Sequence, residues 1–162
     1  MLPNTRFLIA LGSNQRHVRY GSPHAVLNAA IERLTQQGLS VLKHSTIIVT
    51  RPIGPSNRAY ANAAAIIETG LEPDDLLHLL KGIESQFGAR RGQAWSRRVL
   101  DLDIILWSEG SYYNAVPALT IPHPLLRERP FVLQPSAEIA PDWRDPVTGL
   151  TMAHITYRKR QR

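Results

Sequence analysis

The sequence predicts an α+β protein with the ferredoxin-like order βαββαβ, in which an antiparallel sheet carries both helices on one face. Three observations lead to this fold class. Apolar and β-branched runs alternate with two stretches of helical periodicity. Proline and glycine stand at the boundaries between these segments. The 162 residues are enough for one domain with a sizeable core, so we expect a single domain over residues 1–162.

The first half of the chain predicts strands on either side of a helix. Residues 6–11 are a short apolar run that ends at a glycine-containing turn, which predicts a strand. Ser22 followed by Pro23 is typical of a helix start, and Gly38 is a suitable end. Residues 39–49 are rich in β-branched side chains and predict a second strand. The prolines within residues 51–57 predict a loop.

The second half predicts the remaining elements. Residues 60–68 resume extended structure, although their alanines also allow a helix. A helix follows from Pro73 to Gly88 with acidic side chains in its first turn. Residues 89–96 lack any period and predict a mobile basic loop, before a central strand over 99–106. Further on we expect a short strand at 112–114, short helices near 124–127 and 130–133, and a frayed basic tail over about 158–162.

Composition narrows the function classes. A net charge of +6 and a pI near 10.2 favour anionic partners, among which charge alone does not choose. The lack of cysteine excludes disulfides, zinc thiolate sites and thiol catalysis. No apolar run approaches the roughly 20 residues that span a bilayer, and the N-terminus resembles a strand more than a signal sequence. A cytoplasmic protein is therefore the simplest expectation.

Asp101 and Asp103 are the leading candidates for a metal site. On a strand they share one face with Ile105, while Leu102, Ile104 and Leu106 share the other. Adjacent carboxylates repel each other unless a cation lies between them, and Mg²⁺ suits such hard oxygen ligands. The arginines just before them could hold phosphate charge. Without further context, a solvated acidic face paired with these arginines explains the pattern equally well.

Other candidates are weaker when taken singly. Tyr60 and Asn62 would share a strand face and could hold a flat heterocycle, although a sheet-edge tyrosine is the commoner explanation. His123 lies between two prolines and could contact a phosphate. Trp95, in the basic loop, could cover a ligand or pack on the core. No Walker loop or dinucleotide glycine motif is present, so a nucleotide must be bound in another way.

Six segments, taken together in their order, resemble the 6-hydroxymethyl-7,8-dihydropterin pyrophosphokinases of folate biosynthesis. They are IALGSN at 9–14, RPIGP at 51–55, YANAA at 60–64, IESQFG at 83–88, RVLDLDIIL at 98–106, and IPHPLLRERPFVLQPSAEIAP at 121–141. The resemblance implies a ferredoxin-like fold with three flexible loops around the site. It also implies that the β,γ-pyrophosphoryl unit of ATP is transferred to the pterin hydroxymethyl group, leaving AMP.

The resemblance also implies roles for individual residues. Asp101 and Asp103 match the aspartates that hold two Mg²⁺ ions, and the aromatic rings of Tyr60 and Phe131 match those that enclose the pterin. The remaining positions match pterin contacts at Thr50, Ile53, Asn62 and Trp95, and ATP contacts at Glu84, Arg98, Ile104, Thr120, His123 and Arg129.

Some positions depart from the family pattern. The basic loop is about one residue short, so both Arg90 and Arg91 are candidates for the catalytic loop arginine. Ala94 and Arg97 replace an arginine and a proline, and Lys81 and Ala118 replace residues that often contact the nucleotide. Two alternatives therefore stay open, an inactive structural relative and a basic RNA-binding module. The second lacks the run of basic, glycine and aromatic residues that RNA-recognition domains use.

Overall fold

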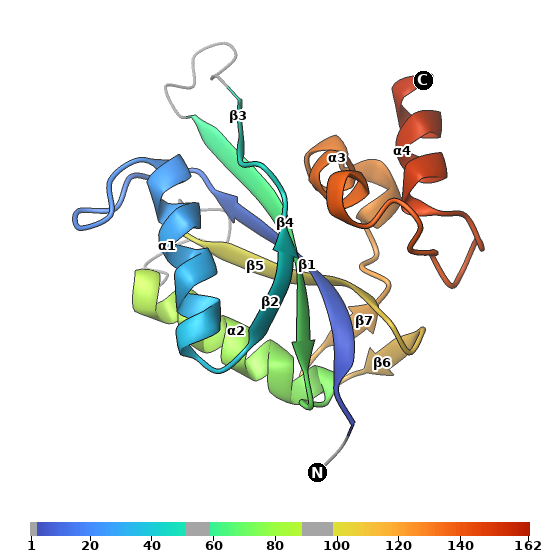
Figure 1. The fold of residues 1–162 in the computed structure, drawn as a ribbon, viewed down its shortest axis with the longest axis horizontal. Coiled ribbons are helices and arrows are strands. Elements are labelled where there is room, and N and C mark those ends of the chain that lie inside the picture. Colours follow the sequence, from blue (N-terminus) through green and yellow to red (C-terminus); the bar gives the residue numbers. More distant parts are fainter. Residues whose placement is uncertain (1–2, 51–58, 89–98) are drawn as a thin grey trace.

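The computed structural model describes residues 3–50, 59–88 and 99–162. An antiparallel five-stranded sheet runs in the order β2-β4-β1-β5, with β3 also paired to β4 (Figure 1). Its strands are β1 (Thr5–Ser13), β2 (Ser40–His44), β3 (Ile48–Thr50), β4 (Tyr60–Thr69) and β5 (Asp101–Trp107). The chain order and the sheet order together confirm the predicted α+β, ferredoxin-like class.

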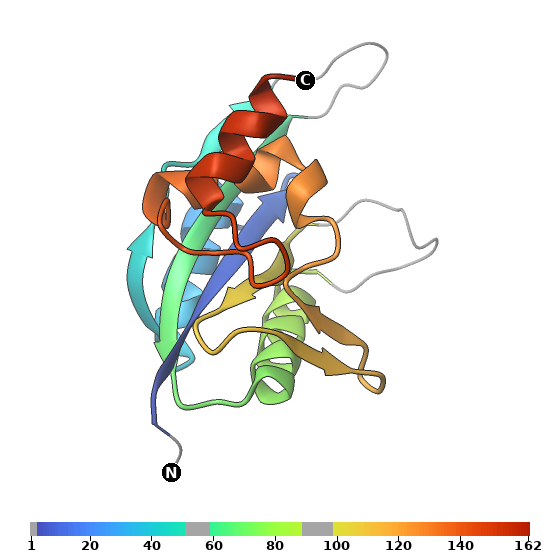
Figure 2. The ribbon, with the colours of Figure 1, turned by 90° about the vertical axis from the view of Figure 1, so that its right-hand side faces the viewer.

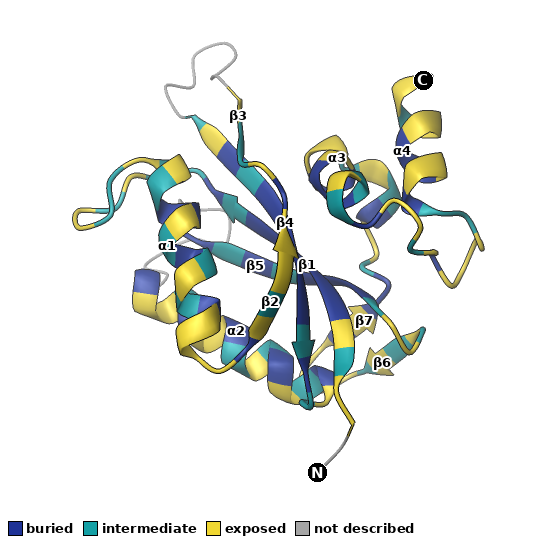
Figure 3. Cartoon of the chain, in the orientation of Figure 1, coloured by how far each residue is buried: buried dark blue, intermediate teal, exposed yellow. Residues whose placement is uncertain are grey.

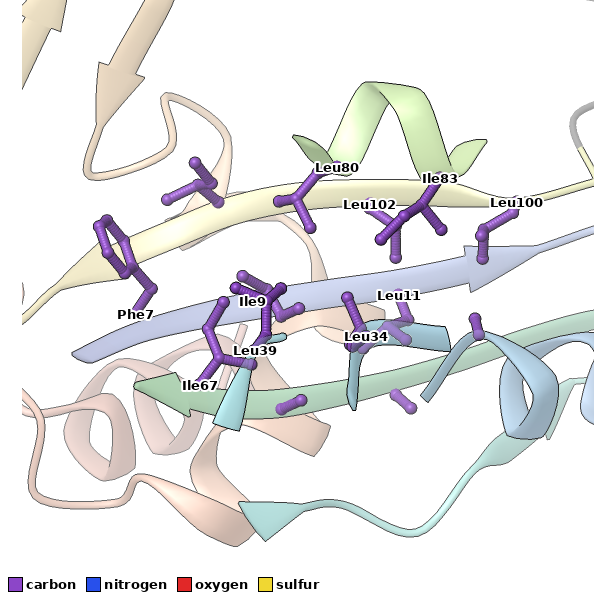
Figure 4. Close-up of a cluster of buried hydrophobic side chains, with 14 of the residues drawn as sticks. Phe7, Ile9, Leu11, Leu34, Leu39, Ile67, Leu80, Ile83, Leu100 and Leu102 are labelled. Atoms are coloured by element: carbon purple, nitrogen blue, oxygen red, sulfur yellow. The ribbon is translucent and has the colours of Figure 1, made fainter. Parts of the chain in front are cut away.

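Helices α1 (Pro23–Gln36) and α2 (Pro73–Phe87) cover one face of the sheet, as predicted. The Ser22 hydroxyl accepts a hydrogen bond from the Ala25 N–H at 3.3 Å and so caps α1. Both helices turn apolar stripes toward the strands, and Figure 4 shows this core. Its central side chains are fully or almost fully buried and include Phe7, Ile9, Leu11, Leu34, Ile67, Leu80, Ile83 and Leu102.

Helices α3 (Pro130–Ile139) and α4 (Met152–Arg160) lie on the opposite side of the sheet, after the short 3₁₀ turn η1 (Leu126–Glu128) (Figure 2). They close a second core on that face, so the strands at the centre of the sheet are mostly buried (Figure 3). The sequence predicted only a short helix near 130–133. The helix continues to Ile139 despite Pro135 inside it, because Val132 and Leu133 are buried in the second core.

The predicted frayed tail over 158–162 is wrong for its first three residues. The last turn of α4 is formed by Arg158, Lys159 and Arg160. Basic side chains at this end of a helix interact favourably with the helix dipole. The helix forms because Met152, Ile155 and Thr156 are buried against the second core. Among the described helices, none is long and apolar enough to cross a membrane.

The single strand predicted over 39–49 is also wrong, because the chain leaves the ladder between β2 and β3. The Ser45 hydroxyl accepts from the Ala64 N–H at 2.9 Å, which replaces a main-chain carbonyl. The N–H of the next residue, Thr46, donates to the Glu138 carboxylate of α3 at 3.1 Å. Side chains therefore satisfy backbone groups that a continuous strand would have paired.

Strand β5 departs from simple alternation after Ile104. Its register against β1 shifts between the pairs Ile9–Ile104 and Leu8–Leu106, which leaves Ile105 as the extra residue of a bulge. Ile105 and Leu106 then both pack into the second core. The prediction that Leu106 shares a face with Leu102 and Ile104 is therefore wrong, while Asp101 and Asp103 precede the bulge and keep their shared face.

A two-stranded hairpin follows β5. Its strand β6 (Tyr112–Asn114) was predicted, whereas β7 (Leu119–Ile121) was not. The hairpin is joined to the start of α2, because the Tyr112 hydroxyl donates to Asp74 Oδ2 at 2.7 Å and the Asn114 amide donates to the same oxygen at 3.2 Å. This contact fixes the segment that leads from the sheet to His123.

Candidate active site

A row of paired residues crosses the sheet and brings the predicted site together. Gly12 in β1 pairs with Asn62 in β4 on one side and with Asp101 in β5 on the other. Two residues further back, Ala10 pairs with Asp103. Directly opposed residues of antiparallel strands turn their side chains to the same face. Asn62 and both aspartates therefore lie on one face, the one that α3 and α4 partly cover.

Small side chains form the floor between the amide and the carboxylates. A Cβ on Gly12 would lie 3.4 Å from Asn62 Oδ1, so the glycine leaves that side of the amide open. Ala10 and Ala64 continue the same face with single methyl groups. The sequence signal was present as Ala10 and Gly12, two residues apart in β1, and Ala64 in β4, and its meaning became clear only from the register.

Two aromatic rings are exposed on this side of the sheet. Tyr60, at the start of β4, keeps 44% of its surface exposed and shares a face with Asn62, as predicted. Phe131, in the first turn of α3, is 48% exposed although it is a large apolar side chain. Thr50 pairs with Tyr60, and its hydroxyl donates to the Tyr60 carbonyl at 3.4 Å. Exposed aromatics of this kind are typical of ligand sites.

Asp103 lies in an electrostatically unfavourable place for a carboxylate. Burial raises the pKa of Asp103 above 3.8, and the neighbouring Asp101 raises it further. Lys81, His123 and Arg129 oppose this shift through their charges. These three basic groups come from α2, from the turn after β7 and from the residue that precedes α3. The tertiary structure thus brings basic side chains from three separate segments near Asp103.

His123 is held by two backbone contacts. Its N–H donates to the Ile105 carbonyl at 3.0 Å, and its Nδ1 lies 3.1 Å from the Leu125 N–H and accepts from it. Neutral His123 therefore carries its proton on Nε2, as assigned from this hydrogen bond. Burial lowers the pKa of His123 below 6.5, while the charge of Asp103 opposes the shift. At neutral pH the ring is a neutral donor.

The remaining predicted nucleotide residues within the described ranges come from α2, β5, β7 and the residue before α3. Glu84 Oε2 accepts from the Leu102 N–H at 2.9 Å, and Lys81 Nζ donates to the same oxygen at 2.8 Å. The Ile104 side chain is buried, so only its main chain can serve a ligand. Thr120 is exposed on β7, and the Arg129 guanidinium lies 5.9 Å from the centre of the Phe131 ring.

The donor set suits Mg²⁺ better than a metal that requires a full protein cage. Within residues 3–50, 59–88 and 99–162, no group of three or more acidic or histidine side chains could enclose a metal ion. Mg²⁺ commonly takes one or two carboxylates and completes its shell with water and substrate phosphates. Asp101 and Asp103 meet that requirement.

Five predicted site residues, Ile53, Arg90, Arg91, Trp95 and Arg98, lie outside the described residues. Their roles stay predictions. Lys81, which the sequence presented only as a departure from the family, proves to be part of the site, since it contacts the strand that carries both aspartates. Lys81 lies four residues before Ser85 on the polar side of α2, and this position in the sequence did not indicate that its side chain reaches β5.

The fold and this acidic, aromatic site define the protein as an α+β enzyme of the phosphotransferase class. Comparison with known proteins makes the assignment specific. Residues 8–141 match the model of the family described as 7,8-dihydro-6-hydroxymethylpterin-pyrophosphokinase (HPPK). The chain belongs to this family, whose members are ATP-dependent diphosphotransferases, and the resemblance found in the sequence is confirmed.

Individual relatives agree with the family match. A 2-amino-4-hydroxy-6-hydroxymethyldihydropteridine pyrophosphokinase of Synechocystis is 42% identical over 73% of this chain and 60% of its own length. The enzyme of the same name from Pseudomonas aeruginosa is 37% identical over 87% of this chain and 84% of its own. A crystal structure of Plasmodium falciparum HPPK-DHPS superimposes with a TM-score of 0.72 at 14% identity, over 96% of this chain and 41% of that one, which supports the fold.

Proposed function

We propose that this chain transfers pyrophosphate from ATP to 6-hydroxymethyl-7,8-dihydropterin, giving the pterin diphosphate and AMP in folate biosynthesis. One observation carries the proposal. Gly12 pairs with both Asn62 and Asp101. This pairing brings two kinds of group onto the same face of one sheet: an amide that can form hydrogen bonds with a heterocycle, and a pair of carboxylates that can hold the metal of a bound phosphate. An acceptor and a phosphoryl donor can then meet over the small residues between them.

The pterin binds on the side of β4. Tyr60 and Phe131 supply aromatic surface, and the Asn62 amide can both donate to and accept from the heterocycle edge. Thr50 and Ile53 offer main-chain groups to the same ligand, and Trp95 covers it. The match of these positions to the family supports their assignment.

ATP binds on the side of β5. Glu84, Ile104 and Thr120 lie on the nucleotide side, while Arg98, His123 and Arg129 contact its phosphates. Asp101 and Asp103 would hold two Mg²⁺ ions, which neutralise phosphate oxygens when bound. The charge of Arg129 already acts on Asp103, which supports a common phosphate region.

The mechanism is positional and electrostatic. The hydroxymethyl oxygen forms a bond to the β-phosphorus of ATP, and its proton is released to solvent. The bond from that phosphorus to the oxygen bridging to the α-phosphate breaks, and AMP leaves with that oxygen. Arg98 and either Arg90 or Arg91 stabilise the transferred group. No side chain need act as a strong general base. The segment that contains Trp95 covers the site and excludes water, which prevents hydrolysis of ATP.

The protein works as a single pterin pyrophosphokinase domain. We propose a cytoplasmic monomer that uses small-molecule substrates and neither nucleic acid nor membrane as partner. The RNA-binding alternative is disfavoured by the second core, because RNA-recognition domains use an open sheet face. Here α3 and α4 cover part of that face.

The test is to incubate the protein with ATP, Mg²⁺ and the reduced hydroxymethylpterin and to measure AMP. We expect AMP only when the pterin is present. AMP formed without pterin, or none at all, contradicts the proposal. Absence of AMP together with salt-sensitive RNA binding would instead identify an RNA-binding module.

A further inference from the structure

Lys81 occupies an unusual position at the edge of the acidic strand. Strand β5 is the last strand of the sheet, with β1 on its inner side. Among the described contacts, the outer main-chain groups of Leu102 are bonded by side chains of α2. Glu84 accepts from the Leu102 N–H at 2.9 Å, and Lys81 Nζ lies 3.4 Å from the Leu102 carbonyl oxygen. Leu102 is the residue between the two aspartates.

This arrangement places a fixed positive charge beside the acidic pair. Lys81 Nζ is tied at 2.8 Å to Glu84, whose side chain is only 13% exposed, so the ammonium is held near the strand. The Lys81 side chain itself is 45% exposed and can still be reached by a ligand. Its charge acts on both Asp103 and His123. A cation so placed repels other cations and attracts phosphate.

We propose that Lys81 determines how metal enters the site: it weakens binding of a free divalent cation to Asp101 and Asp103, and it strengthens binding of the nucleotide phosphates. Metal then arrives with ATP rather than before it. The inference rests on the proposed function, since it takes the two aspartates as metal ligands and ATP as substrate.

The test measures two affinities with opposite expected signs. Mn²⁺ replaces Mg²⁺ as the probe, and its binding to nucleotide-free protein is followed by the loss of the free Mn²⁺ spin resonance signal. We expect Lys81→Gln to bind Mn²⁺ roughly threefold to tenfold more tightly, because one repulsive charge is removed. Calorimetry of ATP binding in excess EDTA should show a loss of affinity by a similar factor.

Matched variants separate a charge effect from damage. Lys81→Arg keeps the charge and should behave as wild type, while Lys81→Met should behave as Lys81→Gln. Lys43→Gln removes an exposed lysine from β2, which lies three strands away from β5 in the sheet, and should change neither affinity. Damage to the fold would weaken both ligands, whereas loss of the charge tightens one and weakens the other.

The outcomes distinguish this inference from the proposed function. Mn²⁺ binding to wild type that Asp103→Asn abolishes supports the metal site, and unchanged Mn²⁺ affinity in Lys81→Gln then overturns the role of Lys81 alone. If wild type binds no Mn²⁺, or if Asp103→Asn binds it equally well, the metal site itself is wrong. Tighter Mn²⁺ binding with unchanged affinity for metal-free ATP would overturn the nucleotide half of the inference.

Discussion

Asp103 is the residue on which the proposed chemistry depends most directly. It faces the same side of the sheet as Asn62, and burial and Asp101 already raise its pKa, so it benefits from a bound cation. We expect Asp103→Ala to lower turnover at least about 100-fold, a loss typical of removing an electrostatic contact to the transition state. AMP release measures turnover, and circular dichroism checks the fold. Near wild-type turnover would contradict the metal assignment.

Asp145 makes a second residue-scale prediction, one of stability. It is fully buried, and Arg127 binds it through Nε at 2.6 Å and through a second nitrogen at 2.8 Å. Burial alone would raise the pKa of Asp145, but the hydrogen bonds from Arg127, the Val147 N–H and Thr148 hold it below 3.8. We expect Asp145→Asn to cost about 2 to 3 kcal/mol of unfolding free energy at pH 7, because it leaves a partly buried arginine without its charge partner.

The pH dependence of this loss follows from the direction of the shift. A lowered folded-state pKa stabilises the protein above the unfolded value near 4, and the stabilisation disappears as the pH falls through the folded-state pKa. Urea unfolding of Asp145→Asn and wild type should therefore converge at low pH. Glu68→Gln is the control, because its pair with Arg6 is more exposed and should contribute less than about 1 kcal/mol. Equal losses at pH 7 from both variants would contradict the prediction.

At the scale of elements, the hairpin β6–β7 depends on its contact with the first turn of α2. The Tyr112 hydroxyl donates to Asp74, a bond that raises the pKa of Tyr112 and keeps the hydroxyl protonated. We expect Tyr112→Phe to lower the free energy of unfolding, because the Asp74 carboxylate loses a hydrogen-bond donor. Amide exchange in β7 should accelerate. Tyr113→Phe, at a tyrosine 75% exposed on the same strand, is the matched control and should have little effect. Equal effects would contradict the role of the contact.

At the scale of the whole molecule, substrate binding should be visible through Trp95. The chain has three tryptophans, and replacing Trp107 and Trp143 with phenylalanine leaves Trp95 as the reporter. The resemblance implies that Trp95 covers the site, so we expect its emission to change when pterin and a non-hydrolysable ATP analogue are both added. A variant that also lacks Trp95 should show no tryptophan response. Unchanged emission of the reporter variant would contradict the role of Trp95.

Local signals determined most of the fold. Ser22 and Pro23 start α1, Gly88 follows α2, and a short apolar run marks β1, because capping, turn geometry and local hydrophobicity depend on neighbouring residues. The break at Ser45 and the bulge at Ile105 did not follow from such signals. Each depends on a partner distant in the sequence, namely β4 and α3 for Ser45 and its neighbour Thr46, and β1 for Ile105.

The sequence by itself determined the family and the types of residue that carry the chemistry, since these are written as short motifs. Only the tertiary structure decided that Gly12 pairs with both Asn62 and Asp101, and that Lys81 reaches the strand between the two aspartates. The physical reason is that sheet register and the approach of α2 to β5 are set by packing across the whole core. The sequence motifs identify the side chains of the site, and the packing of the core brings these side chains together.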